Sequence, residues 1–164
     1  IVPSSMLATV SALSAQNLGA GKEKRATDTL RYATVITTIY GVIVAVLIQF
    51  IAENVVGIFT SDTTVVTMGS AYIRSYIWDC IFAGIHFSFS GYFAACGKSY
   101  IGFLHNIISI TFVRVPGSYL ASKYFTDTLY PMGLAAPAGS LVSVAICVTA
   151  FILLKRKSRV AQTV

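Results

Sequence analysis

Four long apolar runs, preceded by a shorter fifth, constrain this chain more than any other feature. The four runs cover 32–58, 68–96, 100–124 and 134–154, and the chain opens on the fifth at 1–18. A helix needs about 20 apolar residues to cross the hydrocarbon layer of a bilayer, which is roughly 30 Å thick, and each of the four is that long. The sequence therefore predicts an all-α, polytopic membrane helix bundle with about five transmembrane helices.

The composition supports lipid as part of the solvent. The chain is 55% hydrophobic and only 11% charged, which leaves too little polar surface to cover a soluble globule of this size. The strands of a transmembrane barrel would alternate apolar and polar residues over about 10 positions, whereas these runs are continuous. Helices are therefore preferred over a barrel.

The net charge of +6 is distributed unevenly along the chain. If the helices run back and forth, one side of the bundle receives most of the basic residues, namely Lys22, Lys24, Arg25, Arg31, Lys98, Lys155, Arg156, Lys157 and Arg159. The other side has Lys123 and Arg74, with Glu53, Asp62 and Asp127 nearby. Basic connectors face the cytoplasm, so we expect a multi-pass plasma-membrane protein whose first connector and basic tail, 155–164, are cytoplasmic. This asymmetry explains the charge better than nucleic-acid binding, and no nucleic-acid partner is expected.

Two ionisable residues, Asp79 and Arg114, lie well inside the apolar runs. A charge at the centre of a spanning helix costs about 2.5 to 3.5 kcal/mol on insertion scales, so both need an explanation. Their helices are sequential and antiparallel, and both residues lie at a similar distance from the connector at Lys98. Asp79 is then either a permanent carboxylate paired with Arg114, or a coupling site that alternates between Na⁺ or a proton and a substrate.

The helical face that carries Asp79 is polar along its length. Steps of three and four residues place small and polar side chains on it: Tyr72, Ser75, Tyr76, Asp79, Ala83, His86, Ser90, Ala94 and Gly97. Such a face suits a water-filled cavity, in which Tyr76, Asp79 and His86 could take part in coupling, although helix packing would also produce it. His86 is either a second titratable group or a hydrogen-bonded structural histidine. Pro116 should kink its helix because proline lacks a backbone donor.

Small residues recur at a spacing of four within the apolar runs, as in Gly84/Ser88, Ala136/Ser140 and Gly139/Ser143. In lipid such pairs let helix backbones approach closely, so we interpret them as packing contacts rather than as a ligand path.

The three cysteines also lie in apolar runs and are expected to be core residues. No enzyme is expected, because His86 and His105 lie on different helices without a metal-binding spacing or an acidic cluster. No cofactor or metal is expected beyond Na⁺ or a proton as coupling ion.

Several short segments resemble one transporter family in their order and spacing. They are Ala15-Gln16-Asn17-Leu18-Gly19-Ala20-Gly21 with Arg25-Ala26, the stretch 91–97, Arg114-Val115-Pro116, Tyr119-Leu120 and the small residues after Gly133-Leu134. Together they resemble the multidrug and toxic compound extrusion (MATE) transporters over nearly the whole chain, with Gln16, Asn17, Gly19 and Gly21 in the family's signature loop. One departure is Lys98-Ser99, where many members have a polar or acidic residue.

The resemblance implies a fragment that runs from within helix 8 to helix 12 of a twelve-helix protein, and the chain begins at Ile1 inside an apolar run. Its partners would then be membrane lipid, small organic substrates, and the missing helix 7 and N-terminal lobe of the same protein. The family exports drugs and toxic organic compounds in exchange for Na⁺ or H⁺. In some branches a carboxylate on helix 10 forms a cation site, and Asp79 is the position that matches it.

Two other functions remain open from the sequence. A lipid-linked oligosaccharide flippase of the same superfamily would be expected to have a larger basic cavity than Arg114 alone supplies. A non-transporting membrane scaffold or a channel subunit would also fit five helices, and ion flux without counter-transport would favour the channel.

Overall fold

The computed structural model describes residues 2–161, and the side chains of 157–161 lie outside the description, as do residues 162–164 of the expected tail. In that part of the chain all regular structure is helical. The elements in order are α1 (Val2–Gly19), α2 (Glu23–Gly57), α3 (Thr63–Tyr76), α4 (Asp79–Ala95), α5 (Ser99–Ser109), the π-helical turn η1 (Ile110–Arg114), α6 (Val115–Tyr124), α7 (Tyr130–Gly133) and α8 (Ala135–Ala161). The all-α bundle predicted from the apolar runs is confirmed.

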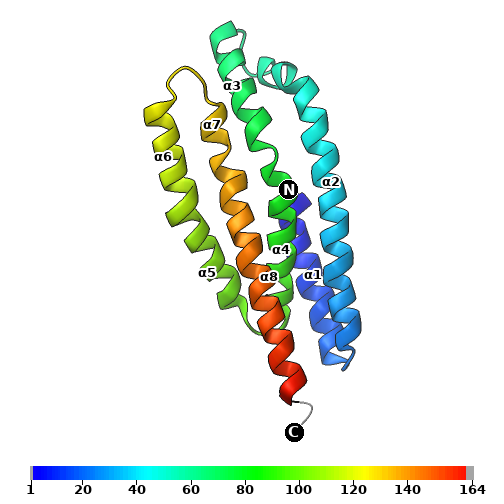
Figure 1. Ribbon diagram of the computed structural model, residues 1–164. Coiled ribbons are helices and arrows are strands. Elements are labelled where there is room, and N and C mark those ends of the chain that lie inside the picture. The colour runs from blue at the N-terminus through cyan, green and yellow to red at the C-terminus, as the bar shows by residue number, and fades with distance from the viewer. Residues whose placement is uncertain (1, 162–164) are drawn as a thin grey trace.

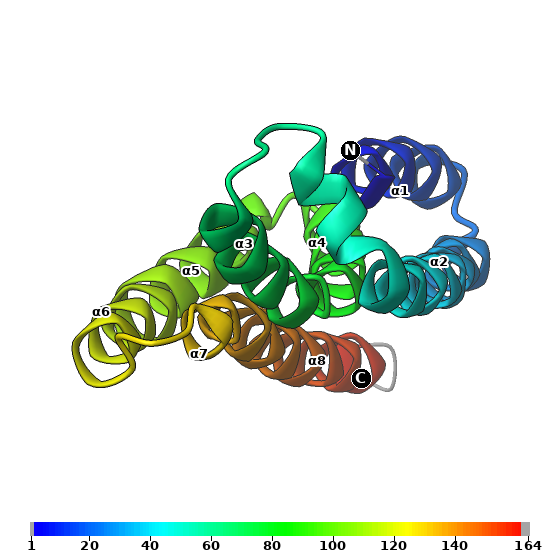
Figure 2. The ribbon, with the colours of Figure 1, turned by 90° about the horizontal axis from the view of Figure 1, so that it is seen from above.

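Helix α4 lies at the centre of the bundle (Figures 1 and 2). Helices α1 and α2 pack on one side of it, whereas α5 and α8 pack on the other. The connectors α1–α2 and α4–α5 and the end of α8 lie together at the lower end in Figure 1, and the connectors α2–α3 and α6–α7 lie at the upper end. The helices therefore alternate in direction as the sequence predicts, and the described part of the basic set gathers at one end, which we call the basic end.

The helices differ from the expected ranges in a consistent way. Helix α2 begins nine residues before 32, and α8 continues past 154 to Ala161, because an apolar run marks only the part of a helix that suits lipid. The range 68–96 is divided between α3 and α4 by a tight turn at Ile77 and Trp78, where the amides of Cys80 and Ile81 bond three residues back. The range 100–124 contains the π turn η1.

Both connectors at the basic end use the same device to end a helix. After α1, the amide of Lys22 donates to the carbonyl of Asn17, and that of Gly21 donates to Leu18. After α4, Lys98 and Gly97 make the equivalent bonds to Phe93 and Ala94. Gly21 and Gly97 each have φ of +70°, the left-handed conformation that this motif requires and that glycine adopts without a Cβ penalty.

Close helix contacts at small residues hold α4 against its neighbours. A Cβ on Gly84 would lie 2.6 Å from the Cβ of Thr37 in α2, and one on Gly91 would overlap the carbonyl oxygen of Leu7 in α1. Below them lies an apolar core with Val10, Phe93 and Cys147 fully buried. The small residues thus act as packing contacts here, because only short side chains let these backbones approach.

Large apolar side chains cover the outside of the bundle. Phe50, Phe103 and Phe112 are 80%, 69% and 73% exposed, although a soluble protein would bury most such side chains. Two stretches, Glu23–Gly57 and Tyr130–Arg156, are long and apolar enough to cross a membrane by themselves. This apolar exterior fits a helix bundle that has lipid around it.

Candidate functional site: a buried ion pair and two histidines

Asp79 is the first residue of α4, directly after the turn that separates α4 from α3. The positive end of a helix dipole favours a carboxylate at this position. The residue is only 7% exposed, so its charge is removed from solvent and needs a partner within the bundle.

Arg114 reaches Asp79 from the other helix of the antiparallel pair. It is the last residue of η1, in which the amide of Val115 bonds to the carbonyl of Ile110 five residues back. The wide turn ends two residues before Pro116, whose missing donor and bulky ring disturb regular α-helical bonding. The effect expected of Pro116 thus takes the form of a π turn that ends at Arg114.

Gly139 in α8 makes room for the Arg114 side chain. A Cβ at Gly139 would lie 2.5 Å from Cγ of Arg114 and 2.8 Å from Oγ of Ser109. Any larger residue at this position would push the arginine away from its present position. The glycine therefore has a second role besides helix packing, which sequence spacing alone did not predict.

Arg114 is shared between two acceptors. Its Nη2 donates to Oδ1 of Asp79 at 3.3 Å and to Oγ of Ser140 at 2.6 Å. Charge-assisted bonds between guanidinium and carboxylate are usually about 2.7 to 2.9 Å long, so the bond to Asp79 is slack and the bond to the hydroxyl is tight. The carboxylate and the arginine are in contact, but the arginine is held mainly by α8.

Two histidines extend this network toward the basic end. Nε2 of His86 lies 3.4 Å from Oγ of Ser140, and the rings of His86 and His105 stack edge to face with centroids 5.4 Å apart. Nε2 of His105 is hydrogen-bonded to Oγ of Ser90 at 2.9 Å. Both histidines are buried, at 5% and 1% exposure. Polar groups thus form a continuous chain from Asp79 to Ser90 through α4, η1, α8 and α5.

Some atoms of this network have no hydrogen-bond partner among the described residues. They include Nδ1 of both histidines and Nε of Arg114. A cavity of about 250 Å³ lies beside the histidines, with Leu7, Ser90, Phe103 and Asn106 among its lining residues. Buried polar atoms without partners are costly, so a polar ligand or an ion in this region would gain stability from them.

The structure brings together Asp79, Arg114 and His86 from the predicted set, but Tyr76 lies apart from their hydrogen bonds. Tyr76 ends α3, is 39% exposed and stacks on Tyr72 with ring centroids 5.6 Å apart. The spacing argument placed Tyr76 and Asp79 on one continuous helical face. The turn at Ile77 and Trp78 interrupts that face.

Sequence reasoning missed three members of the network. Ser140 and Gly139 were interpreted as packing residues, and His105 was considered only as a possible metal ligand. One signal was available: Ser90 and His105 lie on antiparallel helices, eight and seven residues from the connector at Lys98, so their distances from it match. His86 lies twelve residues from Lys98, so its ring contact with His105 was not predictable in this way.

The signature-loop residues Gln16, Asn17, Gly19 and Gly21 lie at the basic end, away from this network. Gln16 and Asn17 accept backbone bonds from Ala20 and Lys22, and the amide of Asn17 donates to the carbonyl of Leu13. Beyond the adjoining backbone, no described atom lies within 4 Å of a Cβ built at Gly19 or Gly21. In this structure they form the turn between α1 and α2.

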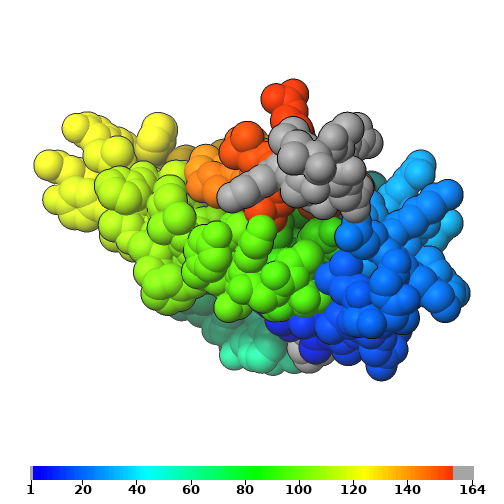
Figure 3. All heavy atoms as spheres, turned by 90° about the horizontal axis from the view of Figure 1, so that it is seen from below, coloured from blue at the N-terminus to red at the C-terminus, as the bar shows by residue number. Residues whose placement is uncertain are grey.

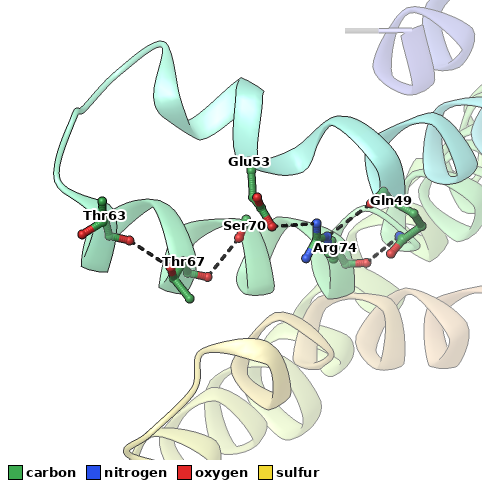
Figure 4. A network of polar contacts seen from close by, with 6 residues as sticks. All are labelled: Gln49, Glu53, Thr63, Thr67, Ser70 and Arg74. Atoms are coloured by element: carbon green, nitrogen blue, oxygen red, sulfur yellow. Dashed lines mark hydrogen bonds and ion pairs between the residues drawn. The ribbon is translucent and has the colours of Figure 1, made fainter.

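A second arginine joins α2 to α3 at the opposite end (Figure 4). Nη2 of Arg74 lies 3.1 Å from Oε1 of Glu53, and Nε of Arg74 donates to the backbone carbonyl of Gln49 at 3.2 Å. The side-chain amide of Gln49 in turn donates to the backbone carbonyl of Arg74 at 3.0 Å. This cluster links the two helices and, among the described residues, shares no hydrogen bond or ion pair with the Asp79 network.

The fold and this buried network define a class, the polytopic helical membrane proteins that carry charged groups inside the bundle. Comparison with family models finds MatE over residues 1–120. The chain belongs to the MatE family, and it is thus a member of a family of membrane transporters rather than of enzymes. Comparison with curated proteins and with solved structures gave no match.

Proposed function

We propose that the chain is part of a secondary active antiporter that exports drugs or toxic organic compounds in exchange for Na⁺ or H⁺. In this proposal it forms helices 8 to 12 of a twelve-helix transporter in the plasma membrane, with the basic end and the C-terminus in the cytoplasm. Helix 7 and the N-terminal lobe would complete the substrate cavity. Family membership supports transport, and the described geometry supports the coupling step.

The observation that carries the proposal is the sharing of Arg114 between Asp79 and Ser140. At 3.3 Å the arginine leaves the carboxylate incompletely neutralised, whereas the 2.6 Å bond to Ser140 holds the arginine in place. Na⁺ or a proton can therefore take over the neutralisation of Asp79 while Arg114 keeps its other partner. The sequence left two interpretations of Asp79 open, and this proposal combines them. Asp79 is ion-paired in one state and cation-bound in another.

A cation that binds at Asp79 would act next to two irregular segments of the helix backbone. Asp79 follows the turn at Ile77 and Trp78, and Arg114 ends the π turn. Irregular backbone of this kind at the depth of a binding site is usual where transporter helices bend between access states. Releasing the Asp79–Arg114 contact would let α4 and α6 move relative to each other.

Coupling also needs a thermodynamic asymmetry. A cation shifts the balance between two states only if it binds one more tightly than the other. The ion-paired state excludes the cation from Asp79, and the separated state admits it, so the cation favours the separated state. A substrate that favours the ion-paired state would then be exchanged for the cation.

The cavity beside the histidines bears on the flippase alternative. Neither lysine nor arginine is among the described residues that line it. A lipid-linked oligosaccharide with a pyrophosphate group would require basic side chains there. The antiporter is therefore the better-supported function.

The test is Asp79→Asn in the full-length transporter, reconstituted in proteoliposomes with imposed Na⁺ or proton gradients. The amide keeps the shape but cannot bind a cation by charge, so substrate efflux should become independent of both gradients. Glu53→Gln is the matched control, because it also neutralises an arginine-paired carboxylate but lies at the other network. Unchanged gradient dependence in Asp79→Asn would remove Asp79 from the mechanism.

A further inference from the structure

A second pocket lies at the basic end of the bundle, away from the Asp79 network. It has a volume of about 200 Å³ and lies between α1, α2, α4 and α8. Its lining residues are Leu18, Glu23, Thr27, Tyr92, Cys96, Lys98, Phe151, Leu154 and Lys155. Figure 3 views the molecule from this end, where the start of α2, the connector after α4 and the end of α8 come together.

The cations of this pocket have no acidic partner. Among the side chains that the structure describes, the ion pairs are Arg74–Glu53 and Arg114–Asp79. Lys155 lies over the ring of Phe151, with its Nζ 5.0 Å from the ring centroid. Lys98 is half-buried beside it in the lining. Two unpaired lysines in one pocket are a place where an anion would be held.

Two helices also begin at this pocket without a side-chain cap. Helix α5 starts after Lys98 and helix α2 starts after Lys22, and neither preceding residue caps its helix with a side-chain hydrogen bond. Free amides at helix N-termini attract negative oxygen atoms, because they combine donors with the positive end of the helix dipole. The start of α2 at Glu23 and the residue before α5, Lys98, both line this pocket, so partly positive backbone lies close to it.

The other walls are apolar and continue onto the surface that faces lipid. Leu18, Phe151 and Leu154 line the pocket, and Leu153, next along α8, is 59% exposed on the outside. An anion bound here would therefore have its uncharged part against apolar side chains. A phospholipid has this combination of a phosphate group and acyl chains.

We propose that this pocket binds the headgroup of an anionic phospholipid of the phosphatidylglycerol type, with Lys98 and Lys155 contacting its phosphate. Glu23 also lines the pocket, and its carboxylate can accept hydrogen bonds from the glycerol hydroxyls. Lys98 and Lys155 outnumber Glu23 in the lining, so the local field favours a negative lipid. A bound lipid would join α1, α2 and α8 at this end.

The experiment measures lipids retained by the purified protein in native mass spectra, after addition of phosphatidylglycerol or phosphatidylcholine in detergent. The protein should retain phosphatidylglycerol preferentially, and Lys98→Gln/Lys155→Gln should lower its apparent affinity about tenfold or more. The matched control is Lys22→Gln/Lys24→Gln, which removes the same charge at the same end but outside the pocket lining, and should change the affinity much less. Lys98→Arg/Lys155→Arg keeps the charge and should keep the lipid.

A second measurement does not depend on lysine substitutions. In a Cys80→Ser/Cys147→Ser background Cys96 is the remaining cysteine, and it lines the pocket. Phosphatidylglycerol should slow the labelling of Cys96 by a maleimide, whereas glycerol phosphate without acyl chains should not.

Three outcomes would overturn the proposal. They are equal retention of phosphatidylcholine, equal loss of lipid in the two double glutamine variants, and binding of phosphatidylethanolamine in place of phosphatidylglycerol. The proposal does not rest on the transport mechanism, so loss of coupling in Asp79→Asn and loss of lipid here are separate results.

Discussion

Two arginine–carboxylate pairs lie in this bundle, and their surroundings differ. The Arg74–Glu53 pair joins α2 to α3 with side chains 34% and 63% exposed, and Arg74 is also held by the backbone of Gln49. The Arg114–Asp79 pair has side chains 29% and 10% exposed, and its arginine is held by a neighbouring hydroxyl. The Arg74–Glu53 pair therefore links two helices at the surface. The Arg114–Asp79 pair lies deeper in the bundle, and its arginine is shared with a second acceptor.

The difference shows that a short distance does not by itself make a pair important. The exposed pair is the shorter of the two, 3.1 Å against 3.3 Å, yet water and salt screen it, and two bonds from side chains to backbone carbonyls also join Gln49 and Arg74. The buried pair is longer, but its loss leaves an uncompensated charge among apolar helices. Substitutions should therefore affect stability and transport far more at the buried pair.

The largest effect is expected from Arg114→Ala. It leaves Asp79 buried without its cation, which should lower the free energy of unfolding by about 3 kcal/mol, the lower end for buried pairs, since Arg114 is 29% exposed. Thermal unfolding in detergent measures this change. The double variant Asp79→Asn/Arg114→Gln should recover part of the loss, and an additive double variant would show that the two side chains do not interact.

Gly139→Ala should come next. The added Cβ would lie 2.5 Å from Cγ of Arg114, so the arginine must move, at a cost of about 1 to 3 kcal/mol. It should also change the cation concentration that gives half-maximal transport. Gly57→Ala is the control, since no described atom outside the adjoining backbone lies within 4 Å of its Cβ position. Equal unfolding temperatures for the two variants would contradict the tight fit of Arg114.

Ser140→Ala should affect stability less but coupling clearly. Hydrogen bonds inside membrane bundles contribute about 0.6 kcal/mol on average, and a charged donor places this one nearer about 1 kcal/mol. Without the hydroxyl, Arg114 should move toward Asp79 and weaken cation binding there, measured as a raised half-maximal cation concentration in proteoliposomes. Ser143→Ala removes a hydroxyl that bonds only the carbonyl of His105 and should leave that concentration unchanged. A lowered value in Ser140→Ala would reverse the proposed role of Ser140.

The smallest effect is expected from Glu53→Gln. Exposed ion pairs contribute about 0 to 1 kcal/mol, and the bonds from the side chains of Gln49 and Arg74 to each other's backbone carbonyls remain in the variant. Unfolding temperatures of the variant and the original protein should converge as salt is added, because salt screens the pair. A loss as large as that of Arg114→Ala would end the distinction between the two pairs.

Much of the fold was predictable from the sequence because lipid imposes a simple rule on helices. Runs of about 20 apolar residues predicted that the chain is helical, and glycine follows the ends of α1 and α4 in both basic-end connectors. Asp79 and Arg114 were predictable as a possible pair, because they lie at similar distances from one connector. The turn at Ile77 and Trp78 was not, since neither residue is a helix breaker, and the role of Tyr76 in coupling stays a prediction.

By itself, the sequence determined that the chain forms antiparallel membrane helices with most of the basic residues at one end and an acid and a base at similar depth inside the apolar runs. These properties follow from the lengths of the apolar runs, the order of the charged residues and the reversal of chain direction at each connector. Each of these can be read from a short segment of the chain. Only the tertiary structure decided that Arg114 divides its bonds between Asp79 and Ser140, that Gly139 makes room for it, and that His86 and His105 meet. Those contacts depend on how α4, α5 and α8 rotate against one another, and that rotation is set by close packing across helices rather than by any single run of residues.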